Sequence, residues 1–307
     1  MRLVSNGRGV GVTEAIHELA AWPVVLVFGL VTQLGDGWFL FVLGGALLVA
    51  GEEFPVLGVD RRRAVFVLAL ALTYVAVVGA LKGYFGLDRP PGATEPPALV
   101  RSPALSWVPG ALSALLERAT TAEGPGFPSG HALGTTMVWG GLALVVDRGT
   151  ARQRAAGAVA IIGLVSLSRL VLGVHYLVDV VAGVAVGLVL LGALYRLADG
   201  GTEPGRVLGV AVATGIAGLF TGVTFDSVAA TGGAVGGWVV WRAVADSTPA
   251  HPTNSGEIVA GFAVLAGAGA LFAALEAVEP SLPVAFVGAT LAVGGAVGAP
   301  LLGERAV

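Results

Sequence analysis

Ten apolar runs without a charged residue constrain this chain more than any other feature of its sequence. They cover residues 19–35, 37–51, 64–81, 132–146, 155–168, 180–195, 207–225, 227–241, 258–275 and 280–303. A helix crosses the hydrocarbon core of a bilayer with roughly 20 mostly apolar residues. Because the runs are continuous rather than alternating, they predict helices and not barrel strands. We therefore expect an all-α, polytopic transmembrane helical bundle, in which 37–51 and 227–241 are short for full spans.

The low share of charged residues excludes a water-soluble fold of this size. Of the 307 residues, 12% are charged and 55% are hydrophobic, and the mean hydropathy is +0.86. An ordinary globular chain has about 25% charged residues. The net charge of −3 argues against nucleic acid as a partner. The absence of cysteine from the sequence excludes disulfides and thiolate metal sites.

Proline marks one long connection between the third and fourth apolar runs. Eight of the 16 prolines lie between Pro90 and Pro128. Connections this long are usually functional or disordered, so we interpret residues 86–128 as a lid or gate, with a short interfacial helix over 109–118. The remaining connections are shorter. We expect a six-helix membrane core over 1–200, followed by about four further transmembrane helices of unknown role over 206–307.

The arginines predict how the bundle sits in the membrane. If the spans alternate, one face carries eight of them: Arg61, Arg62, Arg63, Arg148, Arg152, Arg154, Arg196 and Arg206. By the positive-inside rule this face is cytoplasmic, which predicts an integral protein of the cell membrane with both termini inside. We interpret Arg61 to Arg63 as a topology signal. The opposite, external face also carries basic residues, among them Lys82, the only lysine of the chain, and these need another explanation.

Three short blocks at that external face carry the residues that predict chemistry. The first is Lys82, followed after six residues by Arg89-Pro90. The second is Pro128-Ser129-Gly130-His131. The third is Ser168-Arg169, then His175 after five residues and Asp179 after three more.

The cations in these blocks predict a phosphate-binding site. Lys82, Arg89 and Arg169 converge on one end of the bundle, where unpaired charges would cost on the order of several kcal/mol. An anion with several oxygens removes that cost, because the planar fork of arginine suits phosphate. Ser129 and Gly130 stand at the start of a helix, where free N–H groups favour an anion and glycine lets the backbone approach closely. Ser129 is also the expected N-cap of that helix.

The histidines predict a nucleophile and an acid. His175 and Asp179 are four residues apart, so on a helix the carboxylate can hold one imidazole N–H and leave the other nitrogen free to attack. His131 lies across the site, placed to protonate a leaving oxygen. We expect no metal and no cofactor, because the three cations already supply the charge that Mg²⁺ or Zn²⁺ would bring. Asp36, flanked by two glycines, predicts a tight turn between two helices near the same site.

This three-block pattern closely resembles the type 2 phosphatidic acid phosphatase superfamily of membrane lipid phosphatases. All eleven positions are present in order and with the family's spacing, and the resemblance covers residues 14–197. It implies metal-independent dephosphorylation of a membrane lipid phosphate through a phosphohistidine. Vanadium haloperoxidases share the constellation, but the known ones are soluble, which this composition opposes.

The resemblance also implies a role for each site residue. His175 would be the nucleophile, Asp179 its orienting partner, and His131 the acid for the leaving group and later the base for water. The phosphoryl group would be bound by Lys82, Arg89, Ser129, Gly130 and Arg169.

Three functions remain open at this point. The main prediction is a phosphatase that hydrolyses a lipid phosphate or a polyprenyl diphosphate. A lipid phosphotransferase would use the same site and pass the group to an alcohol. An anion transporter or a structural membrane protein would bind the anion without chemistry, but it would not need the pairing of His175 with Asp179.

Overall fold

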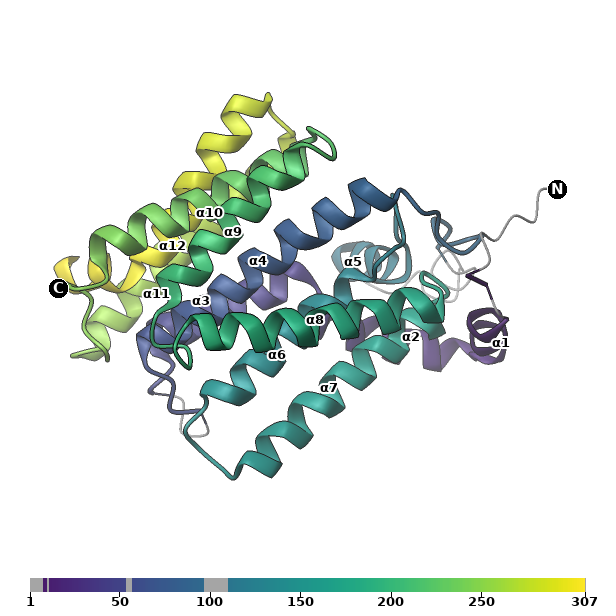
Figure 1. Ribbon diagram of the computed structural model, residues 1–307, viewed down its shortest axis with the longest axis horizontal. Helices are drawn as coiled ribbons and strands as arrows, with labels where there is room; N and C mark the ends of the chain where they lie inside the picture. The colour runs from purple at the N-terminus through teal and green to yellow at the C-terminus, as the bar shows by residue number, and fades with distance from the viewer. Residues whose placement is uncertain (1–7, 10, 54–56, 97–109, 307) are drawn as a thin grey trace.

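The computed structural model describes residues 8–9, 11–53, 57–96 and 110–306, which fold into helices packed side by side (Figure 1). The helices are α1 (Val12–Leu19), α2 (Trp22–Val31), the 3-10 helix η1 (Thr32–Gly35), α3 (Gly37–Ala50), α4 (Arg61–Phe85), α5 (Gly110–Thr120), α6 (Gly130–Val145), α7 (Ala151–Val171), α8 (Leu177–Leu197), α9 (Pro204–Leu219), α10 (Phe225–Val244), α11 (Ser255–Val278) and α12 (Leu282–Ala306). The described residues contain no strand, so the all-α prediction is confirmed. Each of the ten apolar runs contains a helix, and α5 is the short helix predicted over 109–118.

Fewer helices than runs are long and apolar enough to cross a bilayer alone. Within the described ranges these are α4, α7, α8, α11 and α12, with a sixth span if the bent pair of α1 and α2 counts as one. α3 has 14 residues and α9 has 16. At about 1.5 Å per residue, such helices are shorter than the roughly 30 Å hydrocarbon core. The five long helices agree with a polytopic membrane bundle, whereas the shorter ones depend on their neighbours.

The apolar run 19–35 does not form one straight span. α1 and the segment of α2 with η1 meet at a bend of 115°. Arg8 contacts Asp179, so the N-terminal segment lies at the end of the bundle where α8 begins. α12 finishes at the other end, where Gly303 packs against the backbone of Glu257 at the start of α11. The described chain therefore begins and finishes at opposite ends of the bundle, because 19–35 does not cross it in one pass, and the side of the membrane on which each terminus lies stays a prediction.

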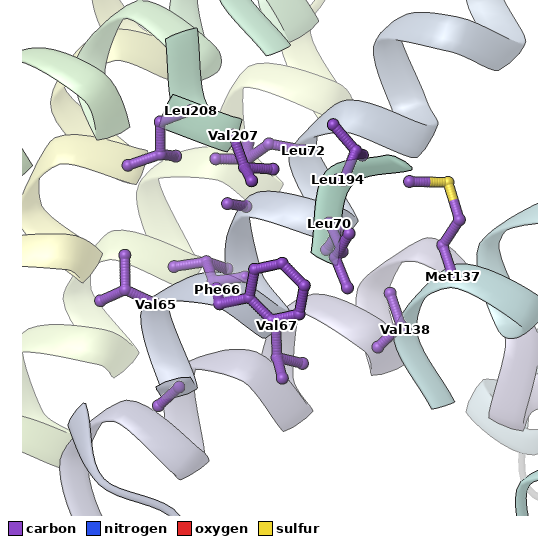
Figure 2. Packing of buried hydrophobic residues seen from close by; sticks show 14 of the residues in the cluster. Val65, Phe66, Val67, Leu70, Leu72, Met137, Val138, Leu194, Val207 and Leu208 are labelled. Carbon is purple, nitrogen blue, oxygen red and sulfur yellow. The ribbon is translucent and has the colours of Figure 1, made fainter. Parts of the chain in front are cut away.

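α4 is the central helix of the bundle. Of its most apolar 18-residue stretch, 72% is buried, and α3, α6, α9 and α10 pack around it. A helix that is apolar all round is expected in such a position. Its side chains Phe66 and Leu70 share one buried cluster with Met137 of α6, Leu194 of α8 and Leu208 of α9 (Figure 2). The main hydrophobic core therefore joins residues from both sides of position 200.

Close backbone contact joins α10 to α12. A Cβ atom added at Gly232 would collide with the carbonyl oxygen of Phe286, and one added at Gly236 with that of Thr290. The four-residue spacing of the two glycines puts them on one face of α10, as in small-xxx-small contacts between membrane helices. The Thr290 hydroxyl also donates a hydrogen bond to the Gly232 carbonyl at 3.0 Å. Larger side chains at these glycines would push the helices apart.

The arginine triplet at the start of α4 makes ion pairs as well as marking topology. The pairs are Arg61–Glu257 at 2.5 Å, Arg62–Asp246 at 3.7 Å and Arg63–Asp147 at 2.6 Å. Positive charge at a helix N-terminus is unfavourable for the helix dipole, and these carboxylates offset it. They come from the start of α11, from the residues after α10 and from the connection between α6 and α7. The triplet therefore fastens one end of α4 to three other parts of the chain.

Candidate active site

The eight predicted site residues meet at the end of the bundle opposite to the arginine triplet. Lys82 and Arg169 lie in the last turns of α4 and α7, Arg89 follows α4, Ser129 to His131 begin α6, His175 precedes α8, and Asp179 lies in the first turn of α8. Burial, and then the charges of Arg89, Arg169 and Lys82, lower the pKa of His175 well below its usual 6.5, and His131 adds to this effect. All three cations therefore act on the same imidazole, as the sequence predicts.

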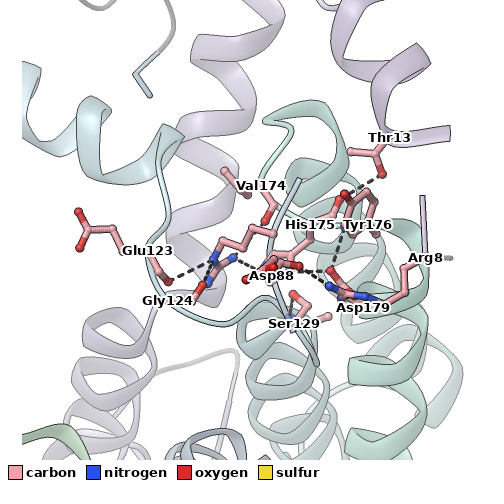
Figure 3. A network of polar contacts seen from close by, with 12 residues as sticks. Arg8, Thr13, Asp88, Glu123, Gly124, Ser129, Val174, His175, Tyr176 and Asp179 are labelled. Atoms are coloured by element: carbon pink, nitrogen blue, oxygen red, sulfur yellow. Dashed lines mark hydrogen bonds and ion pairs between the residues drawn. The ribbon is translucent and has the colours of Figure 1, made fainter. Parts of the chain in front are cut away.

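His175 and Asp179 form a buried pair (Figure 3). The two residues are 1% and 0% exposed, and Nδ1 of His175 lies 3.5 Å from Oδ2 of Asp179. Nε2 of His175 lies 2.9 Å from Nη1 of Arg89. Because a guanidinium can only donate, Nε2 is the acceptor and the imidazole proton is on Nδ1, facing Asp179. This tautomer keeps a lone pair on Nε2.

Asp179 connects the starts of two helices. Its Oδ2 accepts a hydrogen bond from the Tyr176 N–H at 3.0 Å, and its Oδ1 accepts one from Nη1 of Arg8 at 2.5 Å. Its backbone carbonyl accepts one from the Ser129 N–H at 3.0 Å. The first turn of α8 is thereby joined to the start of α6.

Backbone carbonyls from two connections hold Arg89. Its Nε donates to the carbonyls of Glu123 and Gly124 at 3.1 and 3.0 Å, and its Nη1 donates to that of Val174 at 3.0 Å. Burial lowers the pKa of Arg89 to about 10, although the charge of Asp179 opposes this shift. The side chain therefore remains a fixed cation at neutral pH.

The start of α6 has the geometry predicted for Ser129 and Gly130. Ser129 is fully buried and is the N-cap, since its hydroxyl accepts a hydrogen bond from the Ala132 N–H at 3.4 Å. At Gly130 a Cβ atom would lie 3.3 Å from Val78 of α4, so glycine also lets α6 begin close to that helix. The N–H groups of the first turn have no partner within the helix and can bind an anion.

Arg169 is buried beside a residue that the sequence does not single out. It is 3% exposed, and its Nη1 donates a 2.6 Å hydrogen bond to the hydroxyl of Thr32 in η1. Its Nε has no hydrogen-bond partner among the described residues. A buried guanidinium requires an anionic partner, and a phosphate oxygen would be one. Thr32 lies inside an apolar run, where nothing in the local sequence predicts its contact with Arg169.

His131 lies beside Asp36. The distance from His131 Nε2 to Asp36 Oδ2 is 3.7 Å, and the side chains are 24% and 38% exposed. Asp36 caps α3 by accepting a hydrogen bond from the Trp38 N–H at 3.3 Å, which confirms the predicted turn. Burial raises the pKa of Asp36, against the opposing effects of this hydrogen bond and of Arg169. His131 is therefore more open to solvent than His175 and has a carboxyl group of its own.

Arg8 is a second site contact that the sequence does not predict. Its guanidinium binds Asp179, donates to the carbonyl of Asp88, and lies 5.2 Å from the ring centre of Tyr176 and 6.0 Å from that of Phe127. The side chain is 11% exposed. An arginine between glycines ahead of the first apolar run carries no signal for a contact this distant in the chain.

The predicted lid over 86–128 lies next to this site. Residues 97–109 fall outside the described part of the chain. The two described arms pair through a 2.8 Å hydrogen bond from the Ala122 N–H to the Ala93 carbonyl. Together they line a cleft of about 410 Å³ that includes Arg89.

The positive charge of the site comes from the side chains of Lys82, Arg89 and Arg169. Among the described residues, no group of three or more His, Cys, Asp or Glu side chains is arranged to hold a metal ion. Lys82, Arg89 and Arg169 carry donors that suit the oxygens of a phosphoryl group. This arrangement can hold such a group close to a nitrogen nucleophile.

A helical membrane bundle that brings an imidazole–carboxylate pair and three cations to one end is suited to bind phosphate esters. The sequence model of the PAP2 superfamily matches residues 63–202, which include all eight predicted site residues. Residues 63–202 therefore match the type 2 phosphatidic acid phosphatase superfamily, as the motifs predict, and this match supports a phosphatase-type hydrolase with membrane-spanning helices. No curated protein and no solved structure gives a significant match. The matched segment begins later than the predicted 14–197, so Thr32 and Asp36 lie outside it, and Arg8 lies outside both ranges.

Proposed function

We propose that this protein hydrolyses a lipid phosphate monoester or a polyprenyl diphosphate through a phosphohistidine on His175, without a metal. The observation that supports this most strongly is the state of the imidazole. Nε2 carries the lone pair and faces Arg89, whereas Nδ1 carries the proton and faces Asp179. A low pKa for His175 keeps this nucleophile unprotonated at neutral pH.

Binding of the phosphoryl group would come first. Its oxygens would be held by Lys82, Arg89, Arg169 and the N–H groups at Ser129 and Gly130. The Arg89 N–H that donates to the imidazole would then donate to a phosphoryl oxygen. This exchange would free the lone pair for attack.

The chemistry would take two steps. His175 Nε2 attacks phosphorus, the N–P bond forms, and the P–O bond to the lipid alcohol or to the inner phosphate breaks. His131, whose Nε2 lies 3.7 Å from Oδ2 of Asp36, gives its proton to the departing oxygen. Asp179 stabilises the charge that develops on the imidazole. Water then attacks phosphorus, His131 takes its proton, the N–P bond breaks, and inorganic phosphate leaves.

The site would lie at the outer headgroup level of the cell membrane. The eight arginines of the opposite end would be cytoplasmic by the positive-inside rule, with the C-terminal end of α12 beside them. The N-terminal segment from Arg8 would be outside, with the site. Reporter fusions after Leu57 and Thr150 should report cytoplasm, and one after Glu95 should report outside. The reverse pattern would put the substrate in the inner leaflet.

The direct test is phosphate release by the purified protein in detergent with EDTA. The substrates are phosphatidate, phosphatidylglycerol phosphate, polyprenyl monophosphate and polyprenyl diphosphate. We expect release from at least one of them and inhibition by vanadate, which mimics pentacoordinate phosphorus. His175→Ala should abolish release, whereas His251→Ala, which removes a 57% exposed histidine at the other end, should not. Full activity of His175→Ala would refute the mechanism.

Two other functions give different results in the same assay. A phosphotransferase would form the phosphohistidine but transfer the group to an added lipid alcohol, so a new phosphoester would appear in place of inorganic phosphate. An anion transporter or structural protein would bind phosphate without releasing it from any ester. The buried pair of His175 and Asp179 favours chemistry, because binding an anion does not need an imidazole beside a carboxylate.

A further inference from the structure

We infer that Arg8 is a positioning residue for the proposed nucleophile, so that Arg8, Asp179 and His175 act as one chain of contacts. This inference rests on the proposed function, since it takes His175 as the group that attacks phosphorus. Arg8 lies outside the segment that matches the family, residues 63–202. Like Thr32 and Asp36, it adds a contact from outside the matched segment to the site.

The two oxygens of Asp179 have separate partners. Oδ1 lies 2.5 Å from Nη1 of Arg8, whereas Oδ2 accepts the Tyr176 N–H at 3.0 Å and faces His175 Nδ1 at 3.5 Å (Figure 3). A carboxylate held at both oxygens cannot rotate without losing a partner. Its orientation toward His175 therefore depends on Arg8 as well as on the helix.

Burial makes the charge of Arg8 important. Asp179 is 0% exposed, and a buried carboxylate is strongly disfavoured without a charged or hydrogen-bonding partner. Among the described residues, Arg8 is the one arginine or lysine within ion-pair distance of it. Arg89 acts on the same carboxylate from farther away. Without Arg8, the negative charge of Asp179 would be balanced mainly through His175.

The contacts of Arg8 fix its guanidinium from several sides. It lies over the rings of Tyr176 and Phe127 and donates to the carbonyl of Asp88. Only 11% of the side chain is exposed to solvent, so surrounding residues restrict its movement. These contacts hold the guanidinium against Asp179.

α1 fastens the same segment to the connection that carries His175. The Thr13 hydroxyl donates to the His175 carbonyl at 3.1 Å. His17 Nδ1 lies 2.8 Å from the carbonyl of Val171, at the end of α7. The N-terminal segment thus contacts the backbone on both sides of the turn that presents the imidazole.

The test compares phosphate release by four arginine variants of the full chain. Arg8→Ala and Arg8→Gln should lower kcat by about 10- to 100-fold, a size typical of lost outer partners of a reactive group. Arg8→Lys should recover part of this loss, since it restores the charge but not the planar fork. Arg152→Ala, which removes an exposed arginine at the opposite end, is the matched control and should leave kcat unchanged.

A double-mutant cycle shows whether Arg8 acts through Asp179. In an Asp179→Asn background, Arg8→Ala should reduce kcat by no more than about threefold, because the partner charge is already gone. The same 10- to 100-fold loss in both backgrounds would overturn the inference. Increased activity of Arg8→Ala would also overturn it, since Arg8 would then be an obstacle to substrate.

The pH profile separates positioning from packing. The groups that face His175 are Arg89 and the α4, α6, α7 and α8 residues Lys82, His131, Arg169 and Asp179. Without Arg8, the negative charge of Asp179 has no arginine or lysine ion-pair partner among the described residues and stabilises the protonated imidazole of His175 more strongly. The pKa of His175 should then rise, so the acid limb of kcat/KM should move to higher pH. An acid limb unchanged in Arg8→Gln would show a packing role only. Full activity of His175→Ala would instead overturn the proposed function, and this inference with it.

Discussion

Removing Arg61 should weaken the junction between α4 and the C-terminal helices far more than removing its neighbour. Arg61 and Glu257 are 3% and 1% exposed and lie 2.5 Å apart. Arg61 also donates to the carbonyls of Pro249 and His251 at 3.3 and 3.4 Å. Arg61→Ala leaves the Glu257 carboxylate buried, with only the N–H and hydroxyl of Thr253 as partners at 2.8 and 2.9 Å.

The size of the effect follows from burial. Breaking a buried ion pair by removing one partner costs about 3–5 kcal/mol of unfolding free energy, and the Thr253 bonds place the expected loss near the lower end, about 3 kcal/mol. Arg62 is 43% exposed and lies 3.7 Å from Asp246, so Arg62→Ala should cost about 0–1 kcal/mol. Replacing both Arg61 and Glu257 by leucine should recover much of the loss, because no unpaired charge then remains.

The assay is denaturant unfolding in mixed micelles, followed by far-UV circular dichroism. The single variants are compared with each other and with the double leucine variant at the same detergent composition. Phosphatase activity of the folded protein should be unchanged, since the pair lies at the end opposite to the site. Unfolding free energies of Arg61→Ala and Arg62→Ala within about 1 kcal/mol of each other would refute the reasoning.

Three further predictions follow from the site and from helix packing. Because burial and nearby cations lower the pKa of His175, the nucleophile stays unprotonated as pH falls, so the acid limb of kcat/KM should lie below pH 6.5; an acid limb at or above 6.5 would contradict this. Asp36→Asn should slow hydrolysis of a lipid phosphate about 10-fold but that of p-nitrophenyl phosphate much less, since only the poor leaving group needs the acid; equal losses would speak against its role beside the acid. Gly236→Leu should destabilise the fold by about 1–3 kcal/mol through collision with the α12 backbone, whereas Gly267→Leu, where a Cβ atom meets nothing within 4 Å, should be tolerated in the same unfolding assay.

Features encoded by near neighbours in the chain could be predicted from the sequence. The apolar run 64–81 predicts α4, and the Ser129 cap predicts where α6 begins. The four-residue spacing of His175 and Asp179 predicts their pairing at the start of α8. Each of these depends on residues close together in the chain, although His175 precedes α8, so the turn before that helix as well as helical geometry fixes its relation to Asp179.

Contacts between distant parts of the chain could not be predicted in this way. Arg8 and Asp179 are 171 residues apart, and Thr32 and Arg169 are 137 apart, so no local pattern connects them. The bend in the apolar run 19–35 could not be predicted for a related reason. An apolar run predicts that a segment avoids water, but it does not predict whether the segment crosses the bundle or folds back along one end.

The pair of Arg61 and Glu257 changes how the region 206–307 should be regarded. Acyl chains are as apolar as leucine, so lipid could replace most of the surface that α9 to α12 cover on α4. Lipid cannot replace the carboxylate of Glu257. A chain shortened at residue 206 would therefore remain compatible with the bilayer along its sides but would leave a buried arginine without its counter-ion at one end. Lipid could thus take over the apolar contacts between the C-terminal helices and the rest of the bundle, but it could not take over the ion pair.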